Sequence, residues 1–380
     1  MPVLIVIFII SFLIIIHELG HFIAAKKAKV NVEEFGLGYP PKLLTLFSWR
    51  ETDFTLNLIP FGGFVRMEGE NIEDIEELQE KKSILKENKA APFYAKTPKQ
   101  RMVVTLAGVF VNLIFAIVAF SIVFSFLGIP VTLENQARIG QVVPESPAAE
   151  ASLPENVNIV KIEVESVSYQ IQNFHDVQQA VQENLGSQLT ITVTGECDGV
   201  GCLDETNDFL VYARTEVETP EGQGSLGIIF QDVVLNFYPW YEMPFRGTWY
   251  GLKQAIGLGI LIVQALGQML IRLAQTGSVS RDVAGPIGIV HQAQQGNIIS
   301  DDFWMNLGFA GMLSLNLAII NLLPIPALDG GRALFILFEK IFGQSKMKKI
   351  EIYANYVGFA LLVTLIITIT ISDISRIING

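Results

Sequence analysis

The sequence predicts a multi-spanning α-helical membrane protein with a small domain inserted between its spans. Half of its 380 residues are hydrophobic, and the mean hydropathy of +0.42 is too high for an ordinary soluble domain. Four segments are apolar and long enough to cross the roughly 30 Å hydrocarbon core of a bilayer. These segments are 2–25, 103–127, 307–328 and 353–372.

The first of these segments carries three ionisable side chains, His17, Glu18 and His21, and no others. Its positive charges follow the apolar run, so we expect a membrane span rather than a cleaved signal peptide. An ionisable group inside a bilayer costs at least about 2.5 kcal/mol on insertion scales, which favours a functional role for all three.

These three residues form the pattern H-E-L-G-H. His17 and His21 are four residues apart on one helical face and can therefore bind a single Zn²⁺, while Glu18 can accept a proton from water at the metal. The alternative is that the two buried histidines satisfy each other or a backbone carbonyl. The pattern by itself indicates only a zinc hydrolase.

The distribution of charge predicts the orientation in the membrane. Residues 25–101 carry thirteen of the 26 Lys and Arg residues, whereas 128–300 carries seven, against nineteen Asp and Glu. By the positive-inside rule, 26–101 is cytoplasmic, and both the N-terminus and 128–300 are extracytoplasmic. The net charge of −12 argues against nucleic acid as a partner.

Segment 248–275 has polar residues at helical spacings of three and four. This pattern favours an amphipathic helix on the outer membrane surface, within an extracytoplasmic segment 233–306. The alternative is a fifth span.

The cytoplasmic region divides into two parts. Alternating residues and the Gly62-Gly63 pair predict β-hairpins over 30–70. A charged loop, 68–100, leads to the second span and completes the first half of the membrane core, 1–127.

The outer stretch 131–232 alternates short β-like runs with one helical run, Phe174–Asn184, and is predicted to be a single α+β domain. Within it, Cys197 and Cys202 flank a Gly-rich turn. An extracytoplasmic location permits a disulfide between them, although both thiols could equally stay reduced. We read His175 and His291 as structural or solvated.

The second half of the membrane core, 307–380, contains N-L-L-P-I-P-A-L-D-G-G. Pro324 and Pro326 interrupt helical hydrogen bonding, and such a break survives at membrane depth only inside protein or beside a polar cavity. Asp329 follows the break, at a depth similar to that of the two histidines. It is therefore the expected third zinc ligand, with a helix-capping role as the alternative.

Together, H-E-L-G-H, F-G-L-G-Y-P, F-G-G-F-V-R-M and N-L-L-P-I-P-A-L-D-G-G resemble the site-2 protease family of intramembrane zinc metalloproteases, most closely its bacterial regulator of sigma-E protease type. The resemblance also takes in D-V-A-G-P-I-G-I-V, residues 282–290. It implies that His17, His21 and Asp329 bind zinc and that Glu18 is the base. It further implies that Asn321 assists at the substrate, and that a membrane-associated hairpin pairs with the substrate, here through Phe61, Gly62, Gly63 and Phe64.

The outer domain resembles a PDZ domain through I-G-Q-V-V-P-E-S-P-A-A-E-A-S-L, residues 139–153. Pro154-Glu155-Asn156 stands where that family usually has Gly-Asp, which counts against tight capture of peptide carboxylates. A second departure lies in the second span, where this chain has Ala107-Gly108-Val109 and the site-2 protease family usually has Gly-Pro.

We therefore expect a zinc-dependent endopeptidase of the inner, cytoplasmic membrane that cleaves transmembrane segments of single-span proteins, such as an anti-sigma factor or a signal-peptide remnant. The lipid bilayer and transmembrane substrates are the expected partners. Two alternatives are a metal or solute transporter and an inactive membrane scaffold that uses its PDZ-like domain.

Overall fold

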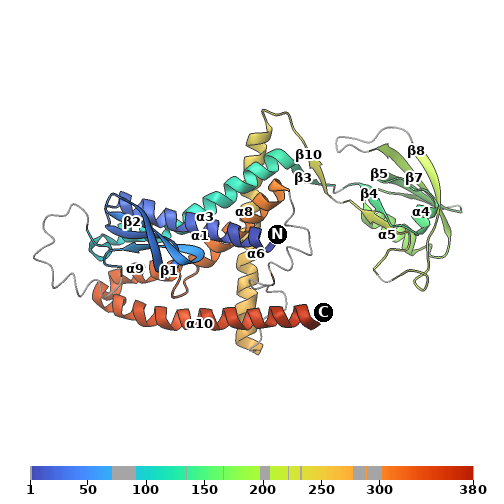
Figure 1. Cartoon of the computed structure of the whole chain (residues 1–380). Helices are drawn as coiled ribbons and strands as arrows, with labels where there is room; N and C mark the ends of the chain where they lie inside the picture. Colours follow the sequence, from blue (N-terminus) through green and yellow to red (C-terminus); the bar gives the residue numbers. More distant parts are fainter. Residues whose placement is uncertain are drawn as a thin grey trace, which may run out of the picture. The chain divides into compact units, whose positions relative to one another are not determined.

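The computed structural model divides the chain into two compact units, which we describe separately. The membrane unit comprises Met1–Phe126 and Pro244–Gly380, and the inserted unit is Leu127–Met243 (Figure 1). The structure describes residues 2–70, 91–133, 135–165, 167–196, 206–220, 222–231, 233–276, 288 and 302–379.

The membrane unit is built mainly from long apolar helices. They are α1 (Pro2–Lys27), α3 (Pro98–Leu127), α6 (Met243–Thr276), α8 (Phe303–Leu322), α9 (Asp329–Phe342) and α10 (Gln344–Asn379). Among the described residues, five of these helices, all except α9, are long and apolar enough to cross a membrane. The chain is thus a multi-pass membrane protein, as its composition predicts.

Helix α8 differs from the predicted span 307–328 at both ends, because it begins at Phe303 and ends at Leu322. Pro324 and Pro326 cannot donate the hydrogen bonds that would continue it. Ala327 then takes a positive φ of 72°, and its N–H donates to Oδ1 of Asn355 in α10 at 2.9 Å. The chain resumes as α9 at Asp329, so this residue begins a new helix beside the break.

Helices α1, α3 and α8 pack closely together. Leu13 of α1 is fully buried, in a cluster with Phe309 and Leu313 of α8. A Cβ added at Gly20 of α1 would stand 2.7 Å from the carbonyl oxygen of Ala107 in α3, so only a glycine allows this approach. The histidine-bearing half of α1 is therefore held directly against α3.

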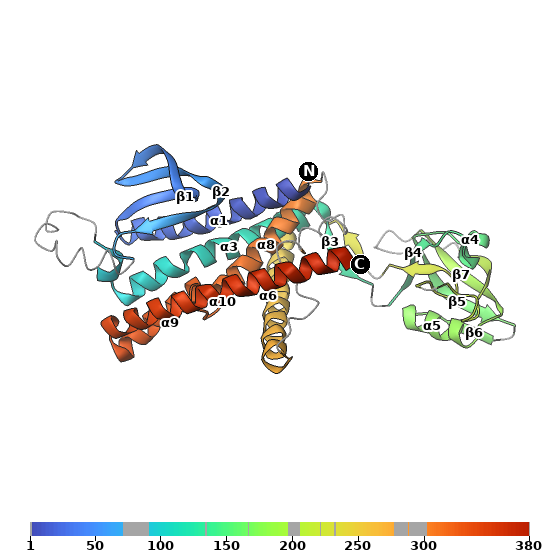
Figure 2. The ribbon, with the colours of Figure 1, turned by 60° about the horizontal axis from the view of Figure 1, so that its bottom comes forward.

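Helix α6 runs at a steep angle to α1, α3 and α10 in both views (Figures 1 and 2). It packs against the C-terminal part of α3. A Cβ added at Gly251 of α6 would stand 2.6 Å from the backbone nitrogen of Ser121 in α3. Ala255 extends the contact through a buried cluster with Phe120 of α3 and Leu315 of α8.

A curled hairpin of β1 (Val32–Trp49) and β2 (Thr52–Met67) lies along α1 (Figure 1). Leu37 of β1 pairs with Gly63 of β2 on one side and with Leu56 on the other, and Leu56 also pairs with Leu44. The two long strands therefore form a sheet of four segments. The segment 63–67 is an edge, since no other described strand pairs with its second side.

At the N-terminal end of α3, Arg101 forms a buried ion pair with Glu339 of α9. Both residues are less than 10% exposed, at 5% and 9%. The short 3-10 helix η1 (Phe93–Ala95) precedes α3. Two elements that are far apart in sequence are thus joined near the start of α3.

The inserted unit contains a sheet with strand order β8-β7-β5-β4-β9 and with β6 paired to β5, together with a separate pair β3–β10. Helix α5 (Phe174–Gln182) begins with a capping box at Asn173, and α4 (Pro147–Glu150) is capped by Ser146. The strands are β3 (Ile129–Thr132), β4 (Ala137–Val142), β5 (Val157–Val164), β6 (Val167–Gln170), β7 (Gln188–Glu196), β8 (Thr206–Tyr212), β9 (Ile228–Phe230) and β10 (Val233–Asn236).

The predicted helical run, Phe174–Asn184, corresponds to α5, which ends at Gln182, whereas α4 was not predicted. The segment 131–232 falls within this unit. The resemblance to a PDZ domain and the domain boundaries remain predictions. Cys197 and Cys202, most of the charged loop and His291 lie outside the described residues.

Candidate metal centre

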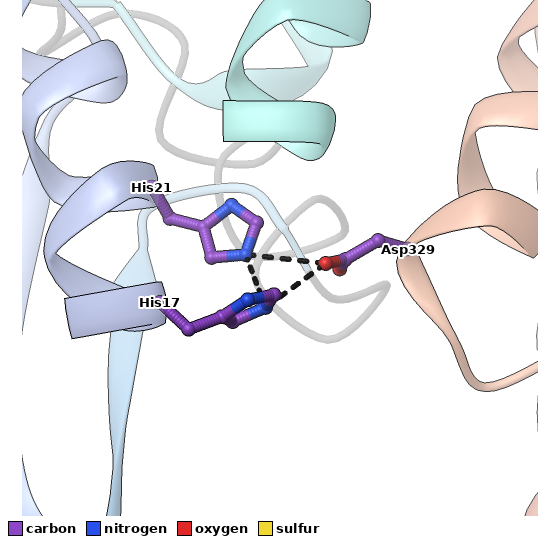
Figure 3. A group of neighbouring side chains, drawn as sticks. All are labelled: His17, His21 and Asp329. Carbon is purple, nitrogen blue, oxygen red and sulfur yellow. Dashed lines mark hydrogen bonds and ion pairs between the residues drawn. The ribbon is translucent and has the colours of Figure 1, made fainter. Parts of the chain in front are cut away.

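The two motif histidines project from the same face of α1, as their spacing predicts. Both are buried, at 8% and 7% exposed, and their Nε2 atoms lie 3.2 Å apart. Figure 3 shows both imidazoles directed toward Asp329, at the start of α9.

Asp329 completes this group from the first turn of α9. Its Oδ2 lies 3.1 Å from Nε2 of His17 and 3.4 Å from Nε2 of His21 (Figure 3). This oxygen is buried and accepts no hydrogen bond within the described part of the chain. Leu328, rather than Asp329, occupies the N-cap position of α9, so the structure gives no support to the capping alternative.

The spacing of the three atoms can be compared with a tetrahedral zinc site. Ligand atoms bound 2.0–2.1 Å from a tetrahedral Zn²⁺ are about 3.3 Å apart. The observed separations of 3.1, 3.2 and 3.4 Å match this value. Two nitrogens and one carboxylate oxygen are also a common donor set of catalytic zinc, so these residues fit the metal.

The other ring nitrogens of the two histidines face α3. Nδ1 of His21 lies 2.8 Å from the carbonyl oxygen of Val104 and donates its proton there. This bond leaves the Nε2 lone pair of the neutral ring directed at the metal position. Nδ1 of His17 lies 3.3 Å from the side-chain amide of Asn112.

Gly108 lies between these two contacts on α3. A Cβ added there would stand 2.5 Å from Nε2 of His21 and 2.7 Å from Nε2 of His17. Because Val104, Gly108 and Asn112 are four residues apart, they form one stripe of α3 that supports both imidazoles.

Glu18 is half-buried beside the histidines and lines two cavities. The first, of about 300 Å³, is also lined by Asn321, Asn112 and Tyr39. The second, of about 220 Å³, is also lined by Phe64, Glu70 and Arg332. His17 and Asp329 line both, so the candidate metal position is reached from two sides.

The hairpin residues predicted to contact substrate lie beside Glu18. A Cβ added at Gly63 would stand 3.8 Å from Cγ of Glu18, and the side chain of Phe64 lines the smaller cavity. Gly62 has a positive φ of 73° and lies against the ring of Tyr39. Phe61 belongs to the same strand, and its side chain lies outside the described part.

Three residues at the site were not predicted to be functional. Asn112 contacts His17, Tyr39 lines the larger cavity, and Arg332 lines the smaller one while it pairs with Glu70 and Glu351. Burial, and secondarily the carboxylate of Glu18, raises the pKa of the Tyr39 phenol, which therefore stays a proton donor at neutral pH. The only sequence signal for Asn112 was an amide inside an apolar span.

His175 lies in the inserted unit, where it is exposed beside Phe174, and it belongs to no metal-binding group among the described residues. This agrees with its reading as a solvated residue.

Comparison with known proteins gives one family for nearly the whole chain. Residues 5–365 match the sequence model of peptidase family M50. The chain is 30% identical to zinc metalloprotease RasP of Oceanobacillus iheyensis, with 98% of this chain and 99% of that protein covered. It is 28% identical to zinc metalloprotease RasP of Geobacillus kaustophilus, with 97% of each chain covered.

The chain therefore belongs to peptidase family M50. This membership confirms the expectation, drawn from the sequence motifs, of a zinc-dependent intramembrane endopeptidase of the site-2 type. A lipid bilayer and membrane proteins in general are its partners.

Proposed function

We propose that His17, His21 and Asp329 hold the catalytic zinc and that Glu18 is the general base of peptide hydrolysis. This assignment rests on the distances of 3.1–3.4 Å between Nε2 of His17, Nε2 of His21 and the buried Oδ2 of Asp329. A catalytic zinc needs three protein ligands and one open position, and the two cavities leave such a position accessible.

When bound, zinc supplies a Lewis acid that polarises the scissile carbonyl and lowers the pKa of water. Glu18 takes the proton of the attacking water and then delivers it to the leaving nitrogen. Asn321 and Tyr39 line the larger cavity and have N–H and O–H groups that can donate to the carbonyl oxygen as it gains negative charge. Tight packing of α1 against α3 holds Glu18 and the histidines in one geometry.

The substrate is a transmembrane segment that binds in extended form along the edge 63–67 of β2. A helix hides its peptide bonds in hydrogen bonds, so it has to unwind before hydrolysis. Strand addition to an open edge holds a peptide extended through main-chain hydrogen bonds. This edge is open among the described strands and lies beside Glu18, which puts an added strand next to the base.

In the proposed topology, four helices cross the membrane, namely α1, α3, α8 and α10. Helix α6 lies on the extracytoplasmic surface of the same membrane. The steep angle of α6 to the other helices (Figures 1 and 2) and its polar stripe support this placement. The protein then lies in the inner membrane, and its N-terminus and inserted unit are on the extracytoplasmic side, as the Lys and Arg distribution indicates. A fifth crossing by α6 is the alternative.

We assign a PDZ-like character to the inserted unit and a role as a size filter for substrates. Its α5 and β9 line a shallow cavity of about 290 Å³. The Pro154-Glu155-Asn156 turn favours weak peptide binding over tight capture. Membrane-bound anti-sigma factors and signal-peptide remnants, whose outer parts are small or have been removed, fit such a filter.

The test compares wild-type protein with Glu18→Gln in proteoliposomes that contain a single-span model substrate. The exposed Glu150→Gln serves as the control carboxyl substitution. Glu18→Gln should keep its zinc and fold and lose cleavage, because an amide cannot accept the proton of water. Zinc-dependent transport with no cleavage by the wild type would favour the transporter alternative, and cleavage by Glu18→Gln within tenfold of wild type would reject Glu18 as the base.

A further inference from the structure

Asn112 is a buried polar residue on the histidine-facing stripe of α3. It is fully buried (0% exposed), and its Nδ2 lies 3.3 Å from Nδ1 of His17. Its Oδ1 is also buried and has no hydrogen-bond partner. A buried amide oxygen without a donor is unfavourable, so this arrangement calls for an explanation.

The orientation of the amide decides which ring nitrogen of His17 carries the proton. If Nδ2 donates to Nδ1, the neutral ring has its proton on Nε2, which points at Nε2 of His21 and Oδ2 of Asp329. A metal could then not use that nitrogen. A half-turn of the amide exchanges its oxygen and nitrogen without moving any other atom.

After this half-turn, Oδ1 of Asn112 accepts the proton of Nδ1, and Nε2 of His17 presents its lone pair to the metal. The unpaired buried oxygen gains a donor at the same time. His21 already has this arrangement, because its Nδ1 donates to the carbonyl oxygen of Val104 at 2.8 Å. Both histidines then bind α3 through Nδ1–H and an amide-type oxygen.

We propose that Asn112 is a positioning residue, which accepts the Nδ1 proton of His17 and thereby fixes the tautomer and ring orientation that bind zinc. The inference rests on the proposed zinc site. It adds to that site a residue outside the three ligands and the base.

The backbone at Asn112 is itself fixed. Its carbonyl oxygen accepts a hydrogen bond at 2.9 Å from Oγ of Ser314 in α8, and Ser314 is fully buried. This bond holds the main chain of residue 112 and does not involve its amide side chain. Ser314 therefore offers a matched control, because its substitution removes a buried hydrogen bond to the same residue without changing the acceptor for His17.

The experiment measures zinc affinity by competition with a chelator for the full-length protein and three variants, Asn112→Leu, Asn112→Asp and Ser314→Ala. The absorption spectrum of the Co²⁺-substituted protein serves as a second readout of ligand geometry. Asn112→Leu has no acceptor and should bind zinc about 10- to 100-fold more weakly, with an altered Co²⁺ spectrum. Asn112→Asp keeps an oxygen acceptor and should bind at least as tightly as the wild type, and Ser314→Ala should stay within about threefold of it.

Two results would overturn the inference. One is zinc affinity and a Co²⁺ spectrum in Asn112→Leu that match the wild type. The other is an equal loss in Asn112→Leu and Asn112→Asp, which would mean that the amide acts as a donor or only fills space. The proposed zinc site is judged separately, because its failure would appear as a wild-type protein that binds no zinc.

Discussion

Gly63 of the β-hairpin lies against Glu18 of α1, with only 3.8 Å between a Cβ added at Gly63 and Cγ of Glu18. The same Cβ would stand 2.9 Å from the carbonyl oxygen of Gly36 in the paired strand and 3.8 Å from the side chain of Ile15 in α1. An open strand edge and the proposed base are thus in contact, so a peptide added to this edge lies next to the group that activates water.

This relationship predicts that a side chain at Gly63 interferes with hydrolysis and leaves the metal in place. Gly63→Val should lower cleavage of a transmembrane substrate on the order of 10²-fold, because a displacement of about 1 Å at a reacting centre has an effect of that size. Its zinc content should equal that of the wild type. Metal analysis and cleavage assays on the same preparation check both statements. Unchanged cleavage would contradict the proposal that the substrate binds along the edge of β2.

A second prediction concerns the close approach of α3 at Gly108. Gly108→Ala should lose most of its zinc, because the added methyl group would stand 2.5 Å from Nε2 of His21. Gly257→Ala in α6 is the matched control, since no heavy atom lies within 4 Å of its added Cβ. Alanine generally favours a helix over glycine by up to about 1 kcal/mol, so helix propensity cannot explain the zinc loss expected in Gly108→Ala. Zinc retention by Gly108→Ala would contradict this account of the histidine environment.

The third prediction concerns the buried ion pair between Arg101 and Glu339. Arg101→Ala should destabilise the protein by about 3–5 kcal/mol, because it leaves a carboxylate buried without a partner. Replacement of both residues by apolar ones of similar size, Arg101→Met with Glu339→Leu, should cost much less. Thermal unfolding in detergent across the double-mutant cycle measures the difference. Equal losses in the single and double variants would show that the pair contributes packing alone.

The fourth prediction concerns the inserted unit. Deletion of 131–232, with a short flexible linker, should permit cleavage of substrates that still carry a large outer domain. Cleavage of substrates without that domain should change much less, because a filter acts by volume. Both substrates are compared in both enzymes at matched expression. Loss of cleavage of the small substrate, with zinc and fold intact, would mean that the unit delivers substrates.

Sequence patterns were sufficient for the parts of the site that depend on local geometry. The spacing of His17 and His21 fixes a shared helical face, and Pro324 with Pro326 marks the break before Asp329. Hydropathy alone placed the end of the third span at 328, because the residues between Leu322 and Asp329 are apolar even though their backbone is not helical.

The remaining parts of the site depend on contacts between distant segments. Asn112 and His17 are separated by 95 residues, and Arg101 and Glu339 by 238. An amide in an apolar span indicates a hydrogen bond to some neighbouring helix, but the pattern does not name the partner. Tyr39 reaches the larger cavity through the curl of β1, which alternating residues do not predict.

The zinc content of purified Asp329→Ala, measured beside wild type and the exposed His175→Ala, tests the central assignment most directly. The wild type and His175→Ala should each hold about one zinc per chain, because two histidines and one carboxylate complete a catalytic site. Asp329→Ala should lose most of it, since only two ligands remain. Full zinc retention by Asp329→Ala, in a folded protein, would contradict the assignment of Asp329 as the third ligand and with it the proposed metal centre.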